Sequence, residues 1–504
     1  MEKESEIFRE YVGIGPNDLR HKMSGLKEEM IKKMVEAKVL DKFRIASTRV
    51  PAYKHFLKKH KINPKKITTL GDFKKLPLTN KSNYLMAYPI KDQVLDGDLS
   101  KVTSITASSG SSGKSFYWPR SLEQDMGIIQ PIEAAFIENF EIDKKKTLHL
   151  TALGMGVWTG GDMVSMAARA IAQKGYDFAT ISTGLDVETN LKIIQDFGDY
   201  FDQIIITVYP SFGKDLVDRG EEIGIDWKKT KVKFFFGGEP FAEEWRNYVF
   251  KKISGTCIYK DIFSCFGSSE GGIAGVESPL CILVRQKCLA NPDLAKRIFG
   301  DNRIPSVVQY NPLSKYFEDV NGELVLTSLN GLPLIRYNTK DAGSTSYMSE
   351  FLQILKENGI DAERELKKAG CSNYWDLPIT YLFGRSDMTA TIYGVNVYPE
   401  NIRASLFHKT IRNFTTGKFF LKTIHDHEGN QILEISLELQ KNIRKSAGFL
   451  KEIQKAIVTY LRENNGEYGK LYESIGAKVT PKIVTMEFGN EEFITENKLK
   501  FVKD

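Results

Sequence analysis

The chain has 504 residues, which is about three times the length of a typical single domain. Hydrophobic residues make up 41% and charged residues 27%, a globular composition that argues against disordered, collagen-like and membrane-spanning classes. Lys and Arg number 70 and Asp and Glu 64, so the net charge of +6 is too small to predict a nucleic-acid or anionic-membrane partner.

The chain begins with a charged segment, MEKESEIFREY, which lacks the apolar core of a secretory signal. No stretch approaches the ~18 uninterrupted apolar residues of a spanning helix. The cysteines are sparse, fit a reducing compartment and lack the C-x2-C and C-x4-C spacings of zinc sites. We therefore expect a cytoplasmic protein with buried or idle thiols. The five cysteines are Cys257, Cys265, Cys281, Cys288 and Cys371.

The first elements in chain order are helical, since apolar residues recur at helical spacing through residues 25–61. From about residue 147, buried apolar strands alternate with helices. Residues 148–156 are expected to be a strand that runs into a glycine turn, and 204–208 and 232–236 are expected to be buried strands. The expected helices are 161–173, 213–222 and 241–253. This alternation predicts a mainly parallel sheet covered by helices on both faces.

The pattern changes near the C-terminus, where residues 433–439 alternate apolar and polar and predict a strand that pairs with 418–424. An amphipathic helix from Phe449 to about residue 464 and a strand at 482–488 complete a small α+β unit. We therefore expect an α/β fold with a large N-terminal domain, residues 1–386, and a small C-terminal domain, residues 387–504. Two segments, 281–319 and 344–380, look like insertions in the large domain, and the second is helical and rich in Lys and Glu.

A glycine–serine segment, SSGSSGK at 108–114, follows a β-branched run. Glycines let a backbone fold around an anion, and serine hydroxyls with Lys114 supply donors and positive charge, so the segment suits phosphate binding. It is not a Walker A loop, because Ser108 stands where that motif needs glycine. Taken alone, a flexible surface loop is an equally good interpretation.

Four further motifs follow in order: FFFGGEP at 234–240, DIFSCFGSSEGG at 261–272, PLIRYNTKDAG at 333–343 and GRSDM at 384–388. Each one alone could be a turn with a solvated charge. Ligands bind at strand-end loops in α/β sheets, so all five motifs together predict a binding site.

The order of these motifs resembles the adenylate-forming superfamily, and most of all its phenylacetate-CoA ligase branch, which includes the CapK-like proteins. The likeness rests on ASSGSSGK, IRY-x-T-x-D and GRSDM…GVNVYPENI, and it runs from about residue 40 to the C-terminus. It implies an AMP-forming carboxylate–CoA ligase that uses ATP, Mg²⁺ and coenzyme A and has a mobile C-terminal lid domain. The alternative is an enzyme that passes the acyl or adenylyl group to an amine, a protein thiol or a hydroxyl.

The resemblance also implies roles for single residues. The loop around the ATP β- and γ-phosphates would consist of Ser108, Ser109, Gly110, Ser111, Ser112, Gly113 and Lys114. Those lying along or near the adenine would be Gly238, Glu239, Pro240 and Phe266. Those near the α-phosphate would be Ser269 and Glu270, with Glu270 as a Mg²⁺ ligand.

Four more roles follow from the resemblance. Asp341 would take both ribose hydroxyls, Arg385 would contact ribose or phosphate, and Asp387 would be the hinge between the domains. Lys498 would be the essential C-terminal lysine, with Lys500 as the other candidate. A solvated lysine in the tail is the alternative interpretation.

Some positions depart from the family pattern. Asn338 and Lys340 stand where relatives often have Arg and Gly, and Phe266 replaces the usual tyrosine. The glycine-rich turn at 153–163 holds Met155 and Trp158, which would line an acyl pocket for an aryl or medium apolar acid. The alternative is that both side chains fill the core. The expected partners are a small carboxylic acid and CoA, with no nucleic acid and no membrane, and a homodimer is compatible with the sequence.

Overall fold

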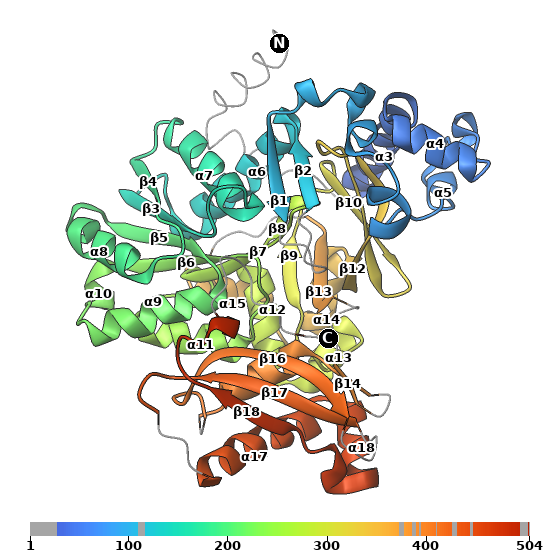
Figure 1. Ribbon diagram of the computed structural model, residues 1–504. Coiled ribbons are helices and arrows are strands. Elements are labelled where there is room, and N and C mark those ends of the chain that lie inside the picture. The colour runs from blue at the N-terminus through green and yellow to red at the C-terminus, as the bar shows by residue number, and fades with distance from the viewer. Residues whose placement is uncertain are drawn as a thin grey trace.

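The computed structural model describes residues 28–108, 116–371, 377–385, 390–392, 395–409, 411–425, 431–443, 447–493 and 502. Within these ranges the chain forms one large mixed sheet with helices on its faces, a two-stranded hairpin, and a two-stranded and a three-stranded sheet near the C-terminus (Figure 1). The expected α/β class is confirmed. No helix in these ranges is both long and apolar enough to cross a lipid bilayer.

Eleven strands of the described residues make the large sheet, in the order β10-β11-β12-β13-β9-β8-β7-β6-β5-β3-β4. The strands from β4 to β7 pair in parallel, as the apolar runs predicted. The residues of β3 and β5 are all buried and those of β6 nearly so, because helices cover both faces of the sheet there, whereas the edge strand β4 and the end of β7 are partly exposed. The parallel strands are β3 (Thr147–Ala152), β4 (Phe178–Ser182), β5 (Gln203–Val208), β6 (Val232–Phe236) and β7 (Ile262–Ser268).

From β7 onward neighbouring strands are antiparallel, so the sheet is mixed where the sequence pattern predicted a mainly parallel one. The change occurs where β7 turns back into β8 through a tight loop at 269–271. The antiparallel strands are β8 (Gly272–Val276), β9 (Ser306–Gln309), β10 (Lys315–Val320), β11 (Glu323–Ser328), β12 (Leu334–Ser346) and β13 (Ile379–Arg385).

The helices that cover the parallel strands follow the predicted positions closely, with starts up to three residues earlier or two later. The helix expected at 213–222 begins at Pro210, because proline is well suited to the first turn of a helix. The covering helices are α6 (Leu122–Ala135), α7 (Thr159–Ala172), α8 (Val187–Phe197), α9 (Pro210–Glu222) and α11 (Glu243–Lys252).

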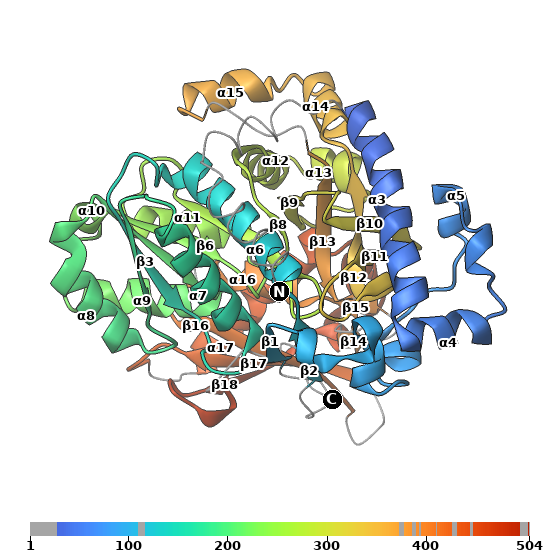
Figure 2. The ribbon, with the colours of Figure 1, turned by 90° about the horizontal axis from the view of Figure 1, so that it is seen from above.

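Two N-terminal helices replace the single helical stretch expected at 25–61. Helix α3 (Glu28–Arg49) ends before Pro51, which starts α4 (Pro51–Lys59). Both helices pack against the antiparallel half of the sheet, and α3 runs beside β10, β11 and β12 (Figure 2). A short hairpin of β1 (Ser104–Ser108) and β2 (Phe116–Arg120) flanks the glycine–serine segment.

Both segments expected to be insertions contribute to the large domain's own structure. The interval 281–319 includes β9, part of β10, most of helix α12 (Pro279–Ala290) and helix α13 (Pro292–Phe299), so it contributes strands to the large sheet itself. The interval 344–380 is helical as expected, with α14 (Met348–Glu357) and α15 (Ala362–Lys368). All four helices share one apolar cluster, and they lie together at one side of the large sheet (Figure 2).

The C-terminal unit has its own core, which consists of residues from Ala390 to Val479 with Val502 packed against it. The expected pairing of 418–424 with 433–439 is confirmed. Its elements are β14 (Ala390–Ile392), β15 (Val395–Val397), α16 (Pro399–Leu406), β16 (Thr415–His425), β17 (Gln431–Leu439), α17 (Ala447–Asn464), α18 (Gly466–Ile475) and β18 (Lys482–Met486). The unit lies below the large sheet in Figure 1.

Candidate functional site

The ends of the parallel strands bring several sequence motifs to one edge of the sheet. Ala152 of β3 is the cross-strand partner of Val208 of β5, and Val208 is the partner of Phe236 of β6. Phe236 in turn pairs with Ser264 of β7. The segments that follow these strands therefore leave the sheet side by side, at the edge where ligands bind in α/β folds.

The base of the glycine–serine segment lies beside the turn after β3. The Ala107 amide donates a hydrogen bond to the Val157 carbonyl at 2.6 Å. The Thr159 hydroxyl at the start of α7 donates to Thr106 Oγ1 at 2.9 Å and to the Ala107 carbonyl at 3.0 Å. Residues 109–114 lie outside the described residues, as does the Ser108 side chain, so their expected contact with phosphate stays a prediction.

The turn after β3 packs tightly on α7. A Cβ at Gly161 would come within 2.2 Å of the Gly154 carbonyl oxygen, so only glycine allows this approach. The Met155 sulfur would lie 3.0 Å from that same Cβ. Trp158 directly precedes α7 and is half-buried. Both candidate acyl-pocket residues are therefore on one turn at the sheet edge.

The GGEP segment, residues 237–240, follows β6 and lies near both α9 and the C-terminal unit. Gly237 donates from its amide to the Val208 carbonyl at 3.2 Å, and Gly238 has a φ of +82°, which favours glycine. Burial, and next the negative charge of Glu239, raise the pKa of Tyr209 to about 12. The Glu239 charge also acts on Arg403 and Lys418, which belong to the C-terminal unit.

The loop that carries Glu270 is tied to the loop between β11 and β12. The Glu270 backbone carbonyl accepts a hydrogen bond from Asn330 Nδ2 at 2.5 Å, and the Gly271 amide donates to Ser268 Oγ at 3.0 Å. Ser269 and Glu270 are half-buried. The ring of Phe266, just before this loop, lies 6.1 Å from the ring of Phe317. Phe266 is half-buried and packs against the apolar cluster of the antiparallel half of the sheet.

Asp341 on β12 is the antiparallel partner of Arg385 at the end of β13. The sheet thus brings together two candidate residues separated by more than forty positions in sequence. Asp341 is half-buried, and its amide donates to Thr339 Oγ1 at 3.2 Å. The side chain of Arg385 lies outside the described residues, as do Asp387, Lys498 and Lys500.

The two departures next to Asp341 share one partner. Asn338 Nδ2 donates to Glu323 Oε2 at 2.6 Å, and Lys340 Nζ lies 3.1 Å from the same oxygen. Lys340 has a φ of +63°, a region where glycine is more usual. Both side chains therefore tie the turn before Asp341 to Glu323 on β11.

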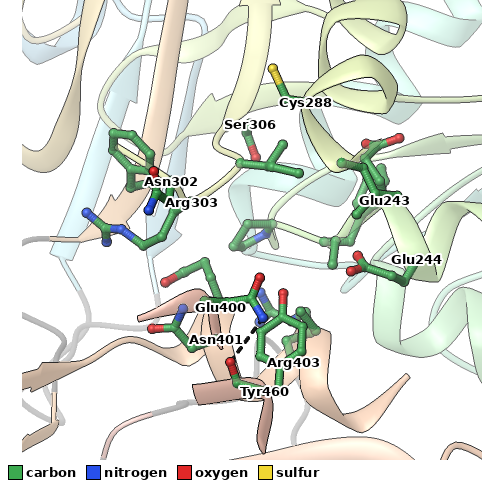
Figure 3. Close-up of a pocket in the computed structure, with 18 of the residues that line it drawn as sticks. Glu243, Glu244, Cys288, Asn302, Arg303, Ser306, Glu400, Asn401, Arg403 and Tyr460 are labelled. Atoms are coloured by element: carbon green, nitrogen blue, oxygen red, sulfur yellow. Dashed lines mark hydrogen bonds between the residues drawn. The ribbon is translucent and has the colours of Figure 1, made fainter. Parts of the chain in front are cut away.

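A pocket lies between the large domain and the C-terminal unit, next to the GGEP segment (Figure 3). Its volume of about 80 Å³ suits several waters rather than a nucleotide. Burial raises the pKa of Glu400 even though Arg403 and Arg303 oppose this. Burial also raises the pKa of Glu244, which faces this pocket from α11. The pocket is therefore a polar junction that borders the candidate site.

A buried ion network beneath GGEP was missed by sequence reasoning. Glu277 Oε1 lies 2.8 Å from Arg246 Nη2 and 2.7 Å from Arg285 Nη1, and Glu243 contacts both arginines. Arg285 also donates to the carbonyl of Phe241 at 2.6 Å. Each of the four charged side chains is at most 1% exposed. One sequence feature could have indicated the network: Arg285 lies within an otherwise apolar helical segment, PLCILVRQKCLA.

A buried lysine was missed as well. Lys315 at the start of β10 is 5% exposed. Burial, and then the positive charges of Arg120 and Lys42, lower its pKa to about 8. On the same face of β10, Phe317 packs toward Phe266. A weakly basic amine therefore lies on the sheet face that carries the candidate adenine-stacking residue.

No group of three or more His, Cys, Asp or Glu side chains able to hold a metal occurs among the described residues. Mg²⁺ is commonly bound by one or two carboxylates together with substrate phosphates. Glu270 fits that mode, because it offers one half-buried carboxylate at the sheet edge.

Curated proteins similar to this chain are coenzyme A ligases. The chain is 27% identical to the phenylacetate-coenzyme A ligase of Thermus thermophilus over 390 residues, which cover 77% of this chain and 76% of that protein. It is 25% identical to the enzyme of the same name from Pseudomonas putida, covering 85% of this chain and 90% of that one. No protein-family profile matches the chain.

Solved structures show the same fold. The crystal structure of 2-hydroxyisobutyryl-CoA ligase in the postadenylation state, in complex with 2-HIB-AMP, aligns with a TM-score of 0.65 at 15% identity. The alignment covers 96% of this chain and 91% of that one. An open conformation of that ligase, in complex with 2-HIB-AMP and CoA, aligns with a TM-score of 0.53 at 14% identity, covering 96% and 93% of the two chains.

Proposed function

We propose that this chain, a member of the adenylate-forming superfamily related to the phenylacetate-CoA ligases, is an AMP-forming acid–CoA ligase. It would activate a carboxylic acid as acyl-AMP with ATP and then transfer the acyl group to CoA. The observation that carries the proposal is the convergence of motifs: the GGEP segment and the Glu270 loop leave adjacent strands, and Asp341 pairs with Arg385 in the same sheet.

The roles of the residues follow from their positions. GGEP would lie along the adenine, with Phe266 near the base and Asp341 binding the ribose hydroxyls. Arg385, paired with Asp341, would contact ribose or phosphate. The segment 108–114 would hold the β- and γ-phosphates, and Ser269 would face the α-phosphate.

The chemical obstacle is the approach of two anions, the carboxylate and the α-phosphate. At ~4 Å and an effective dielectric of ~20, one pair of unit charges repels by about 4 kcal/mol. A bound Mg²⁺ would supply positive charge to the phosphate oxygens. Glu270 would hold that ion, and Lys498 would place a cation between carboxylate and phosphate. Neither residue acts as a covalent nucleophile; both position and neutralise charge.

The second half-reaction needs access for the thiol. We propose a boundary between residues 1–386 and 387–504, with Asp387 as the hinge that lets the C-terminal domain rotate. The separate core of the C-terminal unit supports this division. Mg²⁺ dependence, a cytoplasmic location and a homodimer remain predictions from the sequence.

The acid is expected to be an aryl or medium apolar one. Met155 and Trp158 support this, since both lie on the turn that adjoins the glycine–serine segment. The test is an acid-dependent ATP–pyrophosphate exchange screen over aryl, fatty and amino acids, followed by addition of CoA. Exchange with an aryl or medium apolar acid and thioester formation support the proposal. ADP formation, or exchange without acid, would contradict it.

Replacement of the C-terminal lysine separates the two half-reactions. Lys498→Ala is expected to abolish acyl-AMP formation, because the cation between the two anions is lost, while thioester formation from supplied acyl-AMP survives. Lys500→Ala is the matched control and should retain both. Equal loss of both half-reactions in Lys498→Ala would argue against its assigned role.

A further inference from the structure

Two cysteines from distant parts of the sequence meet in the large domain. Cys257 lies in the loop between α11 and β7, and Cys371 follows α15, 114 residues later. Their sulfur atoms are 3.9 Å apart, and each also lies within 4 Å of the Ala369 carbonyl oxygen. The fold thus places two nucleophilic groups in direct contact, outside the site described above.

Cys257 differs in reactivity from the buried cysteines, whereas the pKa of its partner Cys371 is raised by the hydrogen bond with Cys257 and by burial. A hydrogen bond from Cys371 lowers the pKa of Cys257 to about 7, and Cys257 is half-buried. Burial raises the pKa of Cys281 to about 11 and that of Cys288 to about 12. The thiolate is the reactive form of cysteine, so an oxidant should meet Cys257 before either of these.

The backbone around Cys257 is held in place. The Cys257 amide donates to Asp261 Oδ2 at 3.0 Å, and Thr256 donates to the same oxygen. Asp261 directly precedes β7 and also pairs with Lys233 of the neighbouring strand β6. Cys371 lies on the segment that leads to β13. The pair therefore joins the approaches to two strands whose other ends carry the Glu270 loop and Arg385.

We propose that Cys257 and Cys371 form a modification site that reacts with small-molecule disulfides such as glutathione disulfide. The Cys257 thiolate attacks one sulfur of that disulfide, which forms a mixed disulfide and releases one small thiolate. Cys371 then loses its proton and attacks the Cys257 sulfur, which releases the second small thiol. Two protein thiols are oxidised and one small disulfide is reduced, so electrons balance.

The product is an intramolecular disulfide that needs only a modest local movement. The sulfur atoms must approach from 3.9 Å to the bonding distance of ~2.05 Å. Because the bond closes a loop of more than one hundred residues, it restricts the unfolded chain. The oxidised protein should therefore have a higher thermal midpoint than the reduced protein. This inference does not depend on the proposed ligase activity.

The test incubates the full chain with glutathione disulfide, alkylates it under denaturing conditions and measures intact mass and peptide masses. The number of alkylated cysteines should fall from five to three, with a cross-linked peptide pair containing Cys257 and Cys371. Dithiothreitol should restore all five. Five alkylated cysteines after oxidation, or a cross-link that involves another cysteine, would overturn the proposal.

Three variants separate the steps. Cys371→Ser should stop at a glutathione adduct on Cys257, whereas Cys257→Ser should gain neither adduct nor cross-link. Cys288→Ser, which removes a buried thiol on α12, should still form the cross-link. A wild-type protein that stops at the adduct, as Cys371→Ser should, would show that Cys371 cannot complete the reaction.

Discussion

The ion network beneath GGEP and the contact with the C-terminal unit both contain pairs of oppositely charged side chains, but these pairs differ in burial. In the network, Glu277 accepts hydrogen bonds from two arginines and from the Ser264 amide, and all four charged groups are buried. At the junction, Lys418 pairs with Asp215 at 2.9 Å while both side chains stay about one-fifth exposed. Full burial fixes the network, whereas the partly solvated Lys418–Asp215 pair can exchange its partners for water.

This difference in burial fits the role proposed for each region, which is to fix the adenine-binding segment in one case and to let the lid move in the other. The network links α11, α12 and the start of β7 to the Phe241 carbonyl, directly after GGEP. It therefore holds the adenine segment at a fixed position relative to the strand that carries Phe266. Each of the two units has its own apolar cluster, and Phe407 of the C-terminal unit also packs into the cluster of the large domain. A small apolar contact between two such units suits a lid that must move.

The strongest test of the comparison removes charge from the network. Burial alone would raise the pKa of Glu277, but Arg246 and Arg285 outweigh it and lower the pKa. Glu277→Gln leaves two buried arginines short of a negative charge, so the free energy of unfolding should fall by about 3–5 kcal/mol. Denaturant unfolding measures this loss. Glu188→Gln, which breaks an exposed pair with Arg219, is the control and should leave the midpoint unchanged. An equally small loss in Glu277→Gln would remove the basis of the comparison.

Lys315 is a buried amine with positive rather than negative neighbours, so its effect on stability should depend on pH. The lowered pKa of Lys315 means that the unfolded chain binds more protons between about pH 8 and 10.5, so stability should rise with pH in that window. Lys315→Met removes the cost of burying the charge. It should stabilise the protein at pH 7 by at most about 3 kcal/mol, and the gain should vanish near the upper end of the window. A gain that does not change with pH would show that charge burial is not its cause.

The smallest effect is expected at the junction. Asp215→Asn removes the partly solvated pair with Lys418 while Lys418 keeps the buried Glu438 carboxylate 3.7 Å away, so the unfolding free energy should change by no more than about 1 kcal/mol. The weakened contact should instead let the two units separate more often. Small-angle X-ray scattering would detect this as a larger radius of gyration. A loss of stability close to that of Glu277→Gln would mean that the junction is as rigid as the network.

Sequence patterns predicted the parallel strands well, because buried apolar runs such as 204–208 and 232–236 fit few other structures. The antiparallel half was missed, since its strands alternate less clearly and pair across long sequence separations. The same reason hid the network: Glu243 and Glu277 lie on different elements, and only the fold brings them together.

Some features of the candidate site could likewise be predicted from the sequence, and others could not. Order and spacing of motifs located Glu270, Asp341 and Arg385, and the sheet brings the last two into register. The departures at Asn338 and Lys340 could not be interpreted from the sequence, because their shared partner Glu323 lies on another strand. The glycine–serine residues 109–114, Asp387 and Lys498 lie outside the described residues, so their roles rest on the resemblance to relatives.

The most direct test of the central claim measures the dependence of ATP–pyrophosphate exchange on ATP in Asp341→Ala. If the sheet edge binds the nucleotide through Asp341, the KM for ATP should rise about 10- to 100-fold, equivalent to about 1.4–2.8 kcal/mol. Ser346→Ala, at the far end of the same strand, should leave it unchanged. An unchanged KM in Asp341→Ala, or an equal rise in both variants, would contradict a nucleotide site at this edge.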